Sequence, residues 1–316
     1  MIYPFDRDGG GVLALFVVTL SLHAAFVSYV VAGTAYALVR PGELAHEIRS
    51  RLPFMLGCGI TAGVAPLLFV QLLHQRAFYT ANLLLGPRWL VVVPALVAGF
   101  YGLYLAKSSE RWRRVALAGS LACFAFVAWS WSELHELMQA DAAWRDFYAA
   151  GERLFAGAMI APRLAVIGGA MASQFALIAA WSCGDEDRRR LARVAVAGRL
   201  VSIAGAIWLW RAGFALDDAA RGWLYLLVAA ALVELAAWLA IALGARANRW
   251  LAVATGAGAA TLVAAAIVRE APSVAAMQIP ANAGGAIAFA IAGVLGAAAI
   301  AWVIRTVTAT PDRSDS

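Results

Sequence analysis

Long apolar runs separated by short polar connections dominate the chain. A membrane-spanning helix needs about 20 mostly apolar residues, and nine runs approach or exceed that length. The pattern therefore predicts about nine membrane-spanning helices. Their expected bounds are Val12 to Val39, Pro53 to Gln75, Trp89 to Ala106, Val115 to Ser132, Leu154 to Trp181, Val194 to Leu209, Gly222 to Leu243, Trp250 to Val268 and Gly284 to Ile304.

Composition agrees with this reading of the pattern. Of the 316 residues, 63% are hydrophobic and 14% are charged, whereas soluble domains are roughly 45–50% apolar and about 25% charged. We expect an all-α, polytopic transmembrane helix bundle that forms one domain over residues 1–305. A separate soluble enzyme domain is excluded because little chain remains outside the apolar runs. The polar residues 306–316 are expected to form a disordered cytoplasmic tail.

The basic residues predict an orientation. The net charge is +6, and the Lys and Arg side chains lie mainly in the short connections, almost twice as many in one alternate set as in the other. The positive-inside rule then places the N-terminus outside and the C-terminus in the cytoplasm, as in a protein of the bacterial inner membrane. Charge in such connections sets membrane orientation, so we expect lipid as the partner of this surface and no nucleic acid.

One outer connection is amphipathic. Between residues 141 and 155, the apolar side chains recur at helical spacing, while acidic and basic side chains fill the other faces. This pattern predicts a helix on the periplasmic surface, where it would cap the bundle. The alternative is an amphipathic run that simply leads into the fifth span.

Two ionisable residues fall near the middle of predicted spans. His23 lies about twelve residues into the first span, and Glu234 lies about as far into the seventh, so both are expected near the bilayer midplane at about 1.5 Å per residue. An ionisable group inside a span is costly and is a functional candidate by default. The two are predicted to form a polar pair for a proton relay or for transport. The alternative is that each makes only a helix-to-helix hydrogen bond.

A second group is predicted at the outer face. His74 ends the second span, His135 ends the fourth, and Arg163 lies in the outer part of the fifth. Two histidines at matching depth on different helices suit b-type haem, with arginine near the propionates. The alternative is hydrated histidines at the interface. Neither zinc-ligand spacing nor another recognisable metal motif is present, so we predict no metal site.

The second span also favours a quinone site. Pro66 removes a backbone donor inside the helix, and the resulting kink can open a cavity. A quinone headgroup needs hydrogen-bond donors in an apolar cleft, which Gln71, His74, Tyr79 and Arg163 can supply. The alternative is a packing kink without a ligand.

Three stretches carry a resemblance to a known group. Residues 63–71 with Phe78-Tyr79-Thr80, and later residues 144–148 leading to Pro162-Arg163, resemble a set of polytopic bacterial inner-membrane proteins that are often labelled cytochrome-associated. The resemblance covers about the first 180 residues and implies an electron-transfer context. In that group a histidine usually follows the Pro-Arg pair, whereas residues 164–166 here are Leu-Ala-Val, so the resemblance implies no haem ligand there.

These observations lead to three hypotheses, and no motif names a reaction or a catalytic residue. The first is a membrane subunit of a respiratory or electron-transfer assembly that interacts with quinone or b-type haem and with other membrane or cytochrome subunits. The second is a transporter or channel for a small solute or proton that uses His23 and Glu234. The third is a scaffold subunit whose polar residues serve helix association only.

Overall fold

The computed structural model describes residues 10–152, 154–216, 218–245 and 247–270. The chain divides into two compact units, Met1–Leu15 with Gln278–Ser316, and Phe16–Met277. The first unit contributes only the opening turns of the first helix to the described residues. The ninth predicted span, from residue 284 to residue 304, and the predicted tail, residues 306–316, lie outside the described residues.

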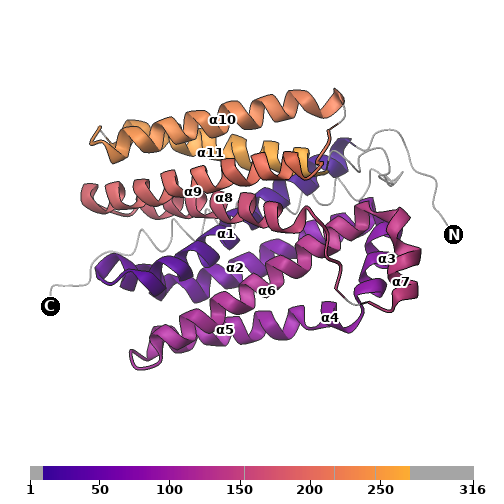
Figure 1. The fold of residues 1–316 in the computed structure, drawn as a ribbon. Helices are drawn as coiled ribbons and strands as arrows, with labels where there is room; N and C mark the ends of the chain where they lie inside the picture. The colour runs from indigo at the N-terminus through magenta and orange to yellow at the C-terminus, as the bar shows by residue number, and fades with distance from the viewer. Residues whose placement is uncertain (1–9, 153, 217, 246, 271–316) are drawn as a thin grey trace. The chain divides into compact units, whose positions relative to one another are not determined.

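The described residues form helices and no strands (Figure 1). The helices are α1 (Gly10–Val39), α2 (Glu43–Leu73), α3 (Gln75–Leu85), α4 (Pro87–Leu90), α5 (Val92–Ser108), α6 (Arg113–Gln139), the short 3₁₀ helix η1 (Asp141–Ala143), α7 (Trp144–Ala150), α8 (Ile160–Ala180), α9 (Asp185–Arg211), α10 (Asp218–Ala242) and α11 (Ala247–Glu270).

Among the described residues, eight segments are long and apolar enough to cross a membrane, which indicates a multi-pass membrane protein in contact with the bilayer. They correspond to the first eight predicted spans. The segments are Leu13–Val39, Glu43–Leu73, Pro87–Ser108, Arg113–Gln139, Ile160–Ala180, Asp185–Arg211, Ala220–Ala242 and Asn248–Glu270.

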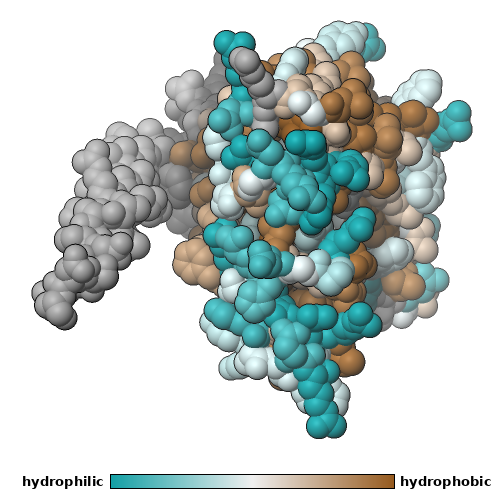
Figure 2. Space-filling model, turned by 90° about the vertical axis from the view of Figure 1, so that its left-hand side faces the viewer, coloured by the Kyte–Doolittle hydropathy of each residue, from teal (hydrophilic) through white to brown (hydrophobic). Residues whose placement is uncertain are grey.

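Short connections make consecutive long helices run in opposite directions, so the helix bundle has two polar ends (Figure 1). We call the end with α3 and α7 the histidine end. The opposite end, which contains the connections 40–42, 109–112 and 181–184, is called the arginine end. Figure 2 views the molecule onto the arginine end, where hydrophilic side chains gather between apolar flanks.

Glycines allow the helix backbones to touch where α8 packs on α9. A Cβ atom at Gly169 would collide with the backbone of Gly198 and Ser202, and one at Gly205 would collide with the backbone near Val166. The lack of a side chain at Gly169 therefore lets the two helices approach closely. This packing fixes the spacing of the two helices without a large apolar side chain between them.

Several predicted bounds are wrong at the polar ends. The fifth span begins at Ile160 and not at Leu154, because backbone N–H groups of the preceding segment bond to glutamates of α6 instead of continuing a helix. The helices η1 and α7 occupy the segment predicted to be an amphipathic helix, but α7 ends at Ala150, where Gly151 follows with a φ of 65°. The helix α3 was not predicted.

Candidate functional site

The histidine end brings together polar side chains from the ends of four helices. His74 follows the last residue of α2, His135 lies in the last turn of α6, Arg163 lies in the first turn of α8, and Glu270 is the last residue of α11. They are far apart in the sequence but meet because these helix ends lie at the same side of the bundle. We call these residues, together with Arg269, the histidine cluster.

One carboxylate joins the two imidazoles. His74 Nε2 lies 3.3 Å from Glu270 Oε2, and His135 Nε2 lies 3.3 Å from Glu270 Oε1. The side chains are nearly removed from solvent, with exposed fractions of 3% for His74, 5% for His135 and 1% for Glu270. Buried polar groups of this kind are stable only when they are paired.

Arginines contact both ring nitrogens of His135. Arg163 Nη1 lies 2.9 Å from His135 Nδ1, and a guanidinium only donates. His135 Nε2 lies 3.3 Å from Glu270 Oε1 and also 3.3 Å from Arg269 Nε, which donates to it. Arg269 Nε, 3.0 Å from Glu270 Oε1, completes the charge balance around the carboxylate. Glu270 is thus shared by two imidazoles and one guanidinium.

Two more carboxylates of α6 hold the connection between α7 and α8. Glu133 pairs with Arg88 and accepts a hydrogen bond from the Phe155 backbone N–H. Glu136 Oε1 accepts from the Met159 N–H at 3.3 Å. A Cβ atom at Gly157 would collide with the Glu136 carboxylate. This connection therefore closes against α6 beside the histidine cluster.

Aromatic rings flank the cluster. The Arg269 guanidinium lies 5.9 Å from the centroid of the Trp131 ring, within cation–π range. Trp131 in turn lies 5.7 Å from the Trp89 ring. The charged groups of the histidine cluster therefore lie next to a pair of tryptophan rings.

The structure brings His74, His135 and Arg163 together as predicted, whereas the other two predicted residues, Gln71 and Tyr79, form a hydrogen bond with each other. Tyr79 Oη donates to Gln71 Oε1 at 3.2 Å, and Tyr79 is half exposed on the apolar surface. The residue that sequence reasoning missed is Glu270. In the sequence, Glu270 directly follows Arg269 at the end of an apolar run, a pattern typical of an interfacial ion pair.

The arrangement does not fit the haem ligation predicted for His74 and His135. A bis-histidine haem needs the iron between two ligand nitrogens, whereas both Nε2 atoms here face the carboxylate of Glu270. Among the described residues, no group of three His, Cys, Asp or Glu side chains is placed to hold a metal ion.

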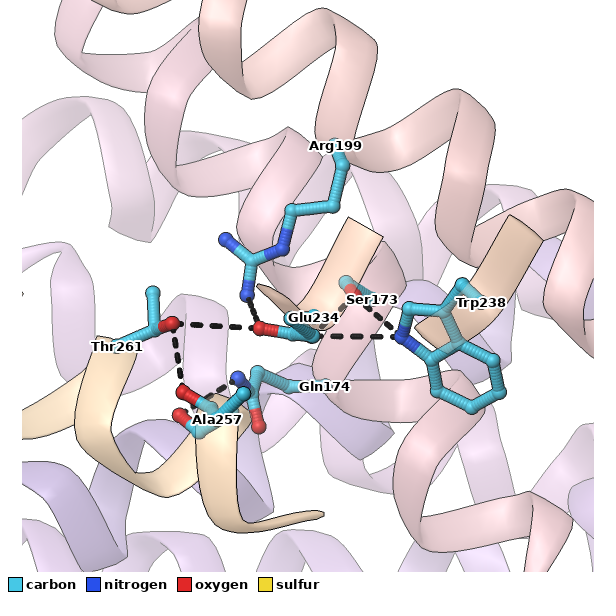
Figure 3. Close-up of polar contacts among 8 residues, drawn as sticks. Ser173, Gln174, Arg199, Glu234, Trp238, Ala257 and Thr261 are labelled. Carbon is cyan, nitrogen blue, oxygen red and sulfur yellow. Dashed lines mark hydrogen bonds and ion pairs between the residues drawn. The ribbon is translucent and has the colours of Figure 1, made fainter. Parts of the chain in front are cut away.

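A second buried polar cluster lies among the long helices α8 to α11 (Figure 3). Glu234 on α10 pairs with Arg199 on α9, and the exposed fractions of these two side chains are 0% and 3%. Ser173 on α8 donates to Glu234 Oε1 at 2.5 Å. Thr261 on α11 lies 3.3 Å from Glu234 Oε2. We call these four residues, with Trp238, the Glu234 cluster.

The Glu234 cluster ties four helices together. The Trp238 indole N–H donates to Ser173 Oγ at 3.1 Å and lies 3.4 Å from Glu234 Oε1. Beside it, Gln174 donates to the Gly258 carbonyl at 3.2 Å, as Figure 3 shows in part. Each oxygen of the buried carboxylate therefore has at least two neighbours, so its charge is compensated within the helices.

The structure gives His23 and Glu234 separate partners. His23 Nδ1 lies 2.9 Å from the Gly59 carbonyl on α2, and its ring fills the space that a Cβ atom at Gly63 would need. The partner of Glu234 is instead Arg199, which sequence reasoning missed. The signal was present, because Arg199 is a charged residue inside the apolar run 194–209.

Comparison with protein families, with curated proteins and with solved structures finds no match to this chain. The resemblance of residues 63–80 and 144–163 to cytochrome-associated membrane proteins therefore stays an expectation.

Proposed function

We propose that this chain is a membrane subunit of an electron-transfer assembly and that the histidine cluster exchanges protons with a quinone headgroup. The observation that carries the proposal is the buried His74–Glu270–His135 arrangement. Burying two imidazoles around one carboxylate is costly in a protein that needs only helix association. Proton exchange would explain that arrangement, because imidazole and carboxylate groups are common proton donors and acceptors in proteins.

Unpaired polar atoms beside the cluster support a ligand there. Arg269 Nη2 and Gln139 Nε2 are buried donors without a hydrogen-bond acceptor among the described residues, and Glu136 Oε2 is a buried acceptor without a donor. Buried polar atoms normally have partners, so such atoms indicate water or ligand. Quinone carbonyls accept hydrogen bonds, and hydroquinone hydroxyls donate them, so the two kinds of atom suit the two redox forms.

The apolar surface next to the cluster supports access from lipid. Gln71 precedes His74 by three residues and therefore lies on the adjacent turn of α2. Its partner Tyr79 is half exposed among apolar residues. A hydrophobic quinone can approach this surface from the bilayer, while electrons come from a partner subunit of the assembly.

We also propose that the arginine end faces the cytoplasm, with the N-terminus outside and the C-terminus inside, in a bacterial inner membrane. The support is the excess of basic residues in the connections at that end. In this orientation the histidine cluster lies at the outer face, where protons released by quinol oxidation would leave the membrane.

A binding measurement tests the quinone proposal. A short-chain ubiquinone analogue is titrated into the detergent-purified full chain, and quenching of tryptophan fluorescence is followed, since Trp131 contacts the cluster. The variant His74→Ala should weaken binding by roughly tenfold or more, the effect of about 1.4 kcal/mol. The matched control His46→Ala, at the arginine end, should bind as the parent does. Equal binding by parent and His74→Ala would contradict the proposal.

Transport is the second candidate, and it rests on the Glu234 cluster. A buried charge inside a span is a functional candidate by default, and Arg199 Nε is buried without a hydrogen-bond acceptor among the described residues. If the chain is a transporter, Glu234→Gln should abolish the uptake of protons or of a small solute into proteoliposomes that contain the protein. Binding of the quinone analogue should stay unchanged. If every variant of both clusters keeps partner assembly and host respiration, the third hypothesis, a scaffold subunit, remains.

A further inference from the structure

A small cavity at the arginine end carries an inference independent of the quinone proposal. It has a volume of about 80 Å³ and lies between the turn that joins α1 to α2 and the turn that joins α5 to α6. Its lining is Ala37, Arg40, Pro41, Gly42, Ala45, His46, Arg49, Glu110 and Arg113. Three arginines and a histidine thus face a single carboxylate.

The carboxylate bridges two of the arginines. Arg49 donates to Glu110 Oε1, and Arg113 Nη1 donates to Glu110 Oε2 at 2.8 Å. The same Arg49 Nη2 lies 2.8 Å from His46 Nδ1. Arg49 is a built-in part of the cavity, since only 4% of its side chain is exposed. An oxyanion held between two guanidinium groups is the arrangement that arginines also form around phosphate.

The charge around the cavity is not fully matched by Glu110. Arg40 makes no side-chain hydrogen bond or ion pair with any described residue, although it lines the same space. The helix α2 begins beside it at Glu43, after the N-cap residue Gly42, which supplies no side-chain hydrogen bond. Its first N–H groups therefore add positive potential to that of the arginines. The cavity has more positive charge than its own carboxylate compensates.

The side chain of Glu110 can move away from the two arginines into water. Its side chain is 65% exposed, and it lies outside the membrane-spanning segments. The Arg49 guanidinium lowers the pKa of the Glu110 carboxyl below its ordinary value, so the group is an anion at neutral pH. If it swings into water, its charge is hydrated there, and two buried or half-buried arginines are left to bind another anion.

We propose that this cavity binds a phosphate group and that Glu110 is the resident carboxylate that the phosphate displaces from Arg49 and Arg113. The phosphate belongs either to a lipid headgroup or to a soluble phosphate compound. The cavity lies where the apolar parts of α1 and α2 end, which is the depth of lipid headgroups. Displacement makes Glu110 a competitor, so its removal must strengthen binding.

Two probes distinguish the sources. Inorganic phosphate is titrated calorimetrically into the full chain in a neutral detergent. In parallel, the chain is placed in nanodiscs of phosphatidylcholine with or without phosphatidylglycerol, and the lipid that stays bound is identified by native mass spectrometry. Binding of phosphate alone assigns a soluble ligand, retention of phosphatidylglycerol alone assigns a lipid, and both together assign a site for either. Binding of neither probe overturns the proposal.

Two opposite substitutions test the residues. Arg113→Ala combined with Arg40→Ala should weaken binding of the effective probe by roughly tenfold, about 1.4 kcal/mol. Glu110→Gln should strengthen it several-fold, since the competing charge is gone. The matched control is Arg190→Ala, which removes an exposed arginine that forms ion pairs on α9 outside the cavity. Weaker binding by Glu110→Gln, or equal losses in Arg190→Ala and the double variant, would overturn the assignment even if all variants fold.

Discussion

The two buried polar clusters contain similar charges but differ in how those charges are satisfied. In the Glu234 cluster, partners from α8, α9 and α11 surround the carboxylate, and the arginine is almost fully buried. In the histidine cluster, Arg269 is about a quarter exposed, and nearby donors and acceptors lack partners among the described residues. The Glu234 carboxylate is saturated, and Arg199 Nε is the one atom of that cluster without an acceptor among the described residues, whereas several such atoms beside the histidine cluster leave capacity for a ligand.

The largest expected effect is at Glu234. Glu234→Ala leaves the Arg199 charge buried and unpaired, which should destabilise the protein by about 3–5 kcal/mol. The control is the double variant Arg199→Met with Glu234→Met, which removes both charges and should be nearly neutral or stabilising. Denaturant unfolding in detergent measures both. A double variant as unstable as the single one would show that the cluster is more than a paired charge.

The second-largest loss of stability is expected where α8 packs closely on α9, beside the Glu234 cluster. Gly169→Ala places a Cβ atom against the backbone of α9, and the forced separation should cost about 1–3 kcal/mol. The neighbouring Gly168→Ala is the matched control, because a Cβ atom there meets no atom within 4 Å. Thermal unfolding of the two variants in the same detergent should differ; identical melting would rule out close packing at this point.

A smaller loss of stability is expected at the histidine cluster. Glu270→Gln removes the charge that faces Arg269, but that arginine is partly exposed and stacks on Trp131. We expect a loss of about 1 kcal/mol together with strongly weakened binding of a quinone analogue. If Glu270→Gln lost as much stability as Glu234→Ala and still bound the quinone analogue as the parent does, the role of the histidine cluster would be structural.

The smallest effect is expected at Tyr79. Tyr79→Phe removes only the hydrogen bond to Gln71 on the half-exposed surface, and such bonds between membrane helices contribute about 0.6 kcal/mol. Quinone-analogue affinity should change less than in Glu270→Gln. A tenfold loss in Tyr79→Phe would place the tyrosine in the ligand site, as its sequence position first suggested.

The apolar runs were sufficient to predict the long helices among the described residues. Hydropathy identifies segments that can cross a bilayer, so eight predicted spans coincide with apolar helices of the structure, and polar residues near span ends pointed to His74, His135 and Arg163, which the structure brings together. The sequence did not predict which buried polar side chains pair with one another. Whether Glu234 meets His23 or Arg199 depends on which helices are neighbours and how each is rotated, and neither is encoded in the pattern along one helix.

The central claim is that the histidine cluster is the functional one and the Glu234 cluster is structural. The most direct measurement compares quinone-analogue binding by Glu270→Gln with binding by the double variant Arg199→Met with Glu234→Met, using folded protein of each. The account predicts that Glu270→Gln loses binding by about tenfold or more and that the double variant binds as the parent does. Full binding by Glu270→Gln with loss in the double variant would contradict it.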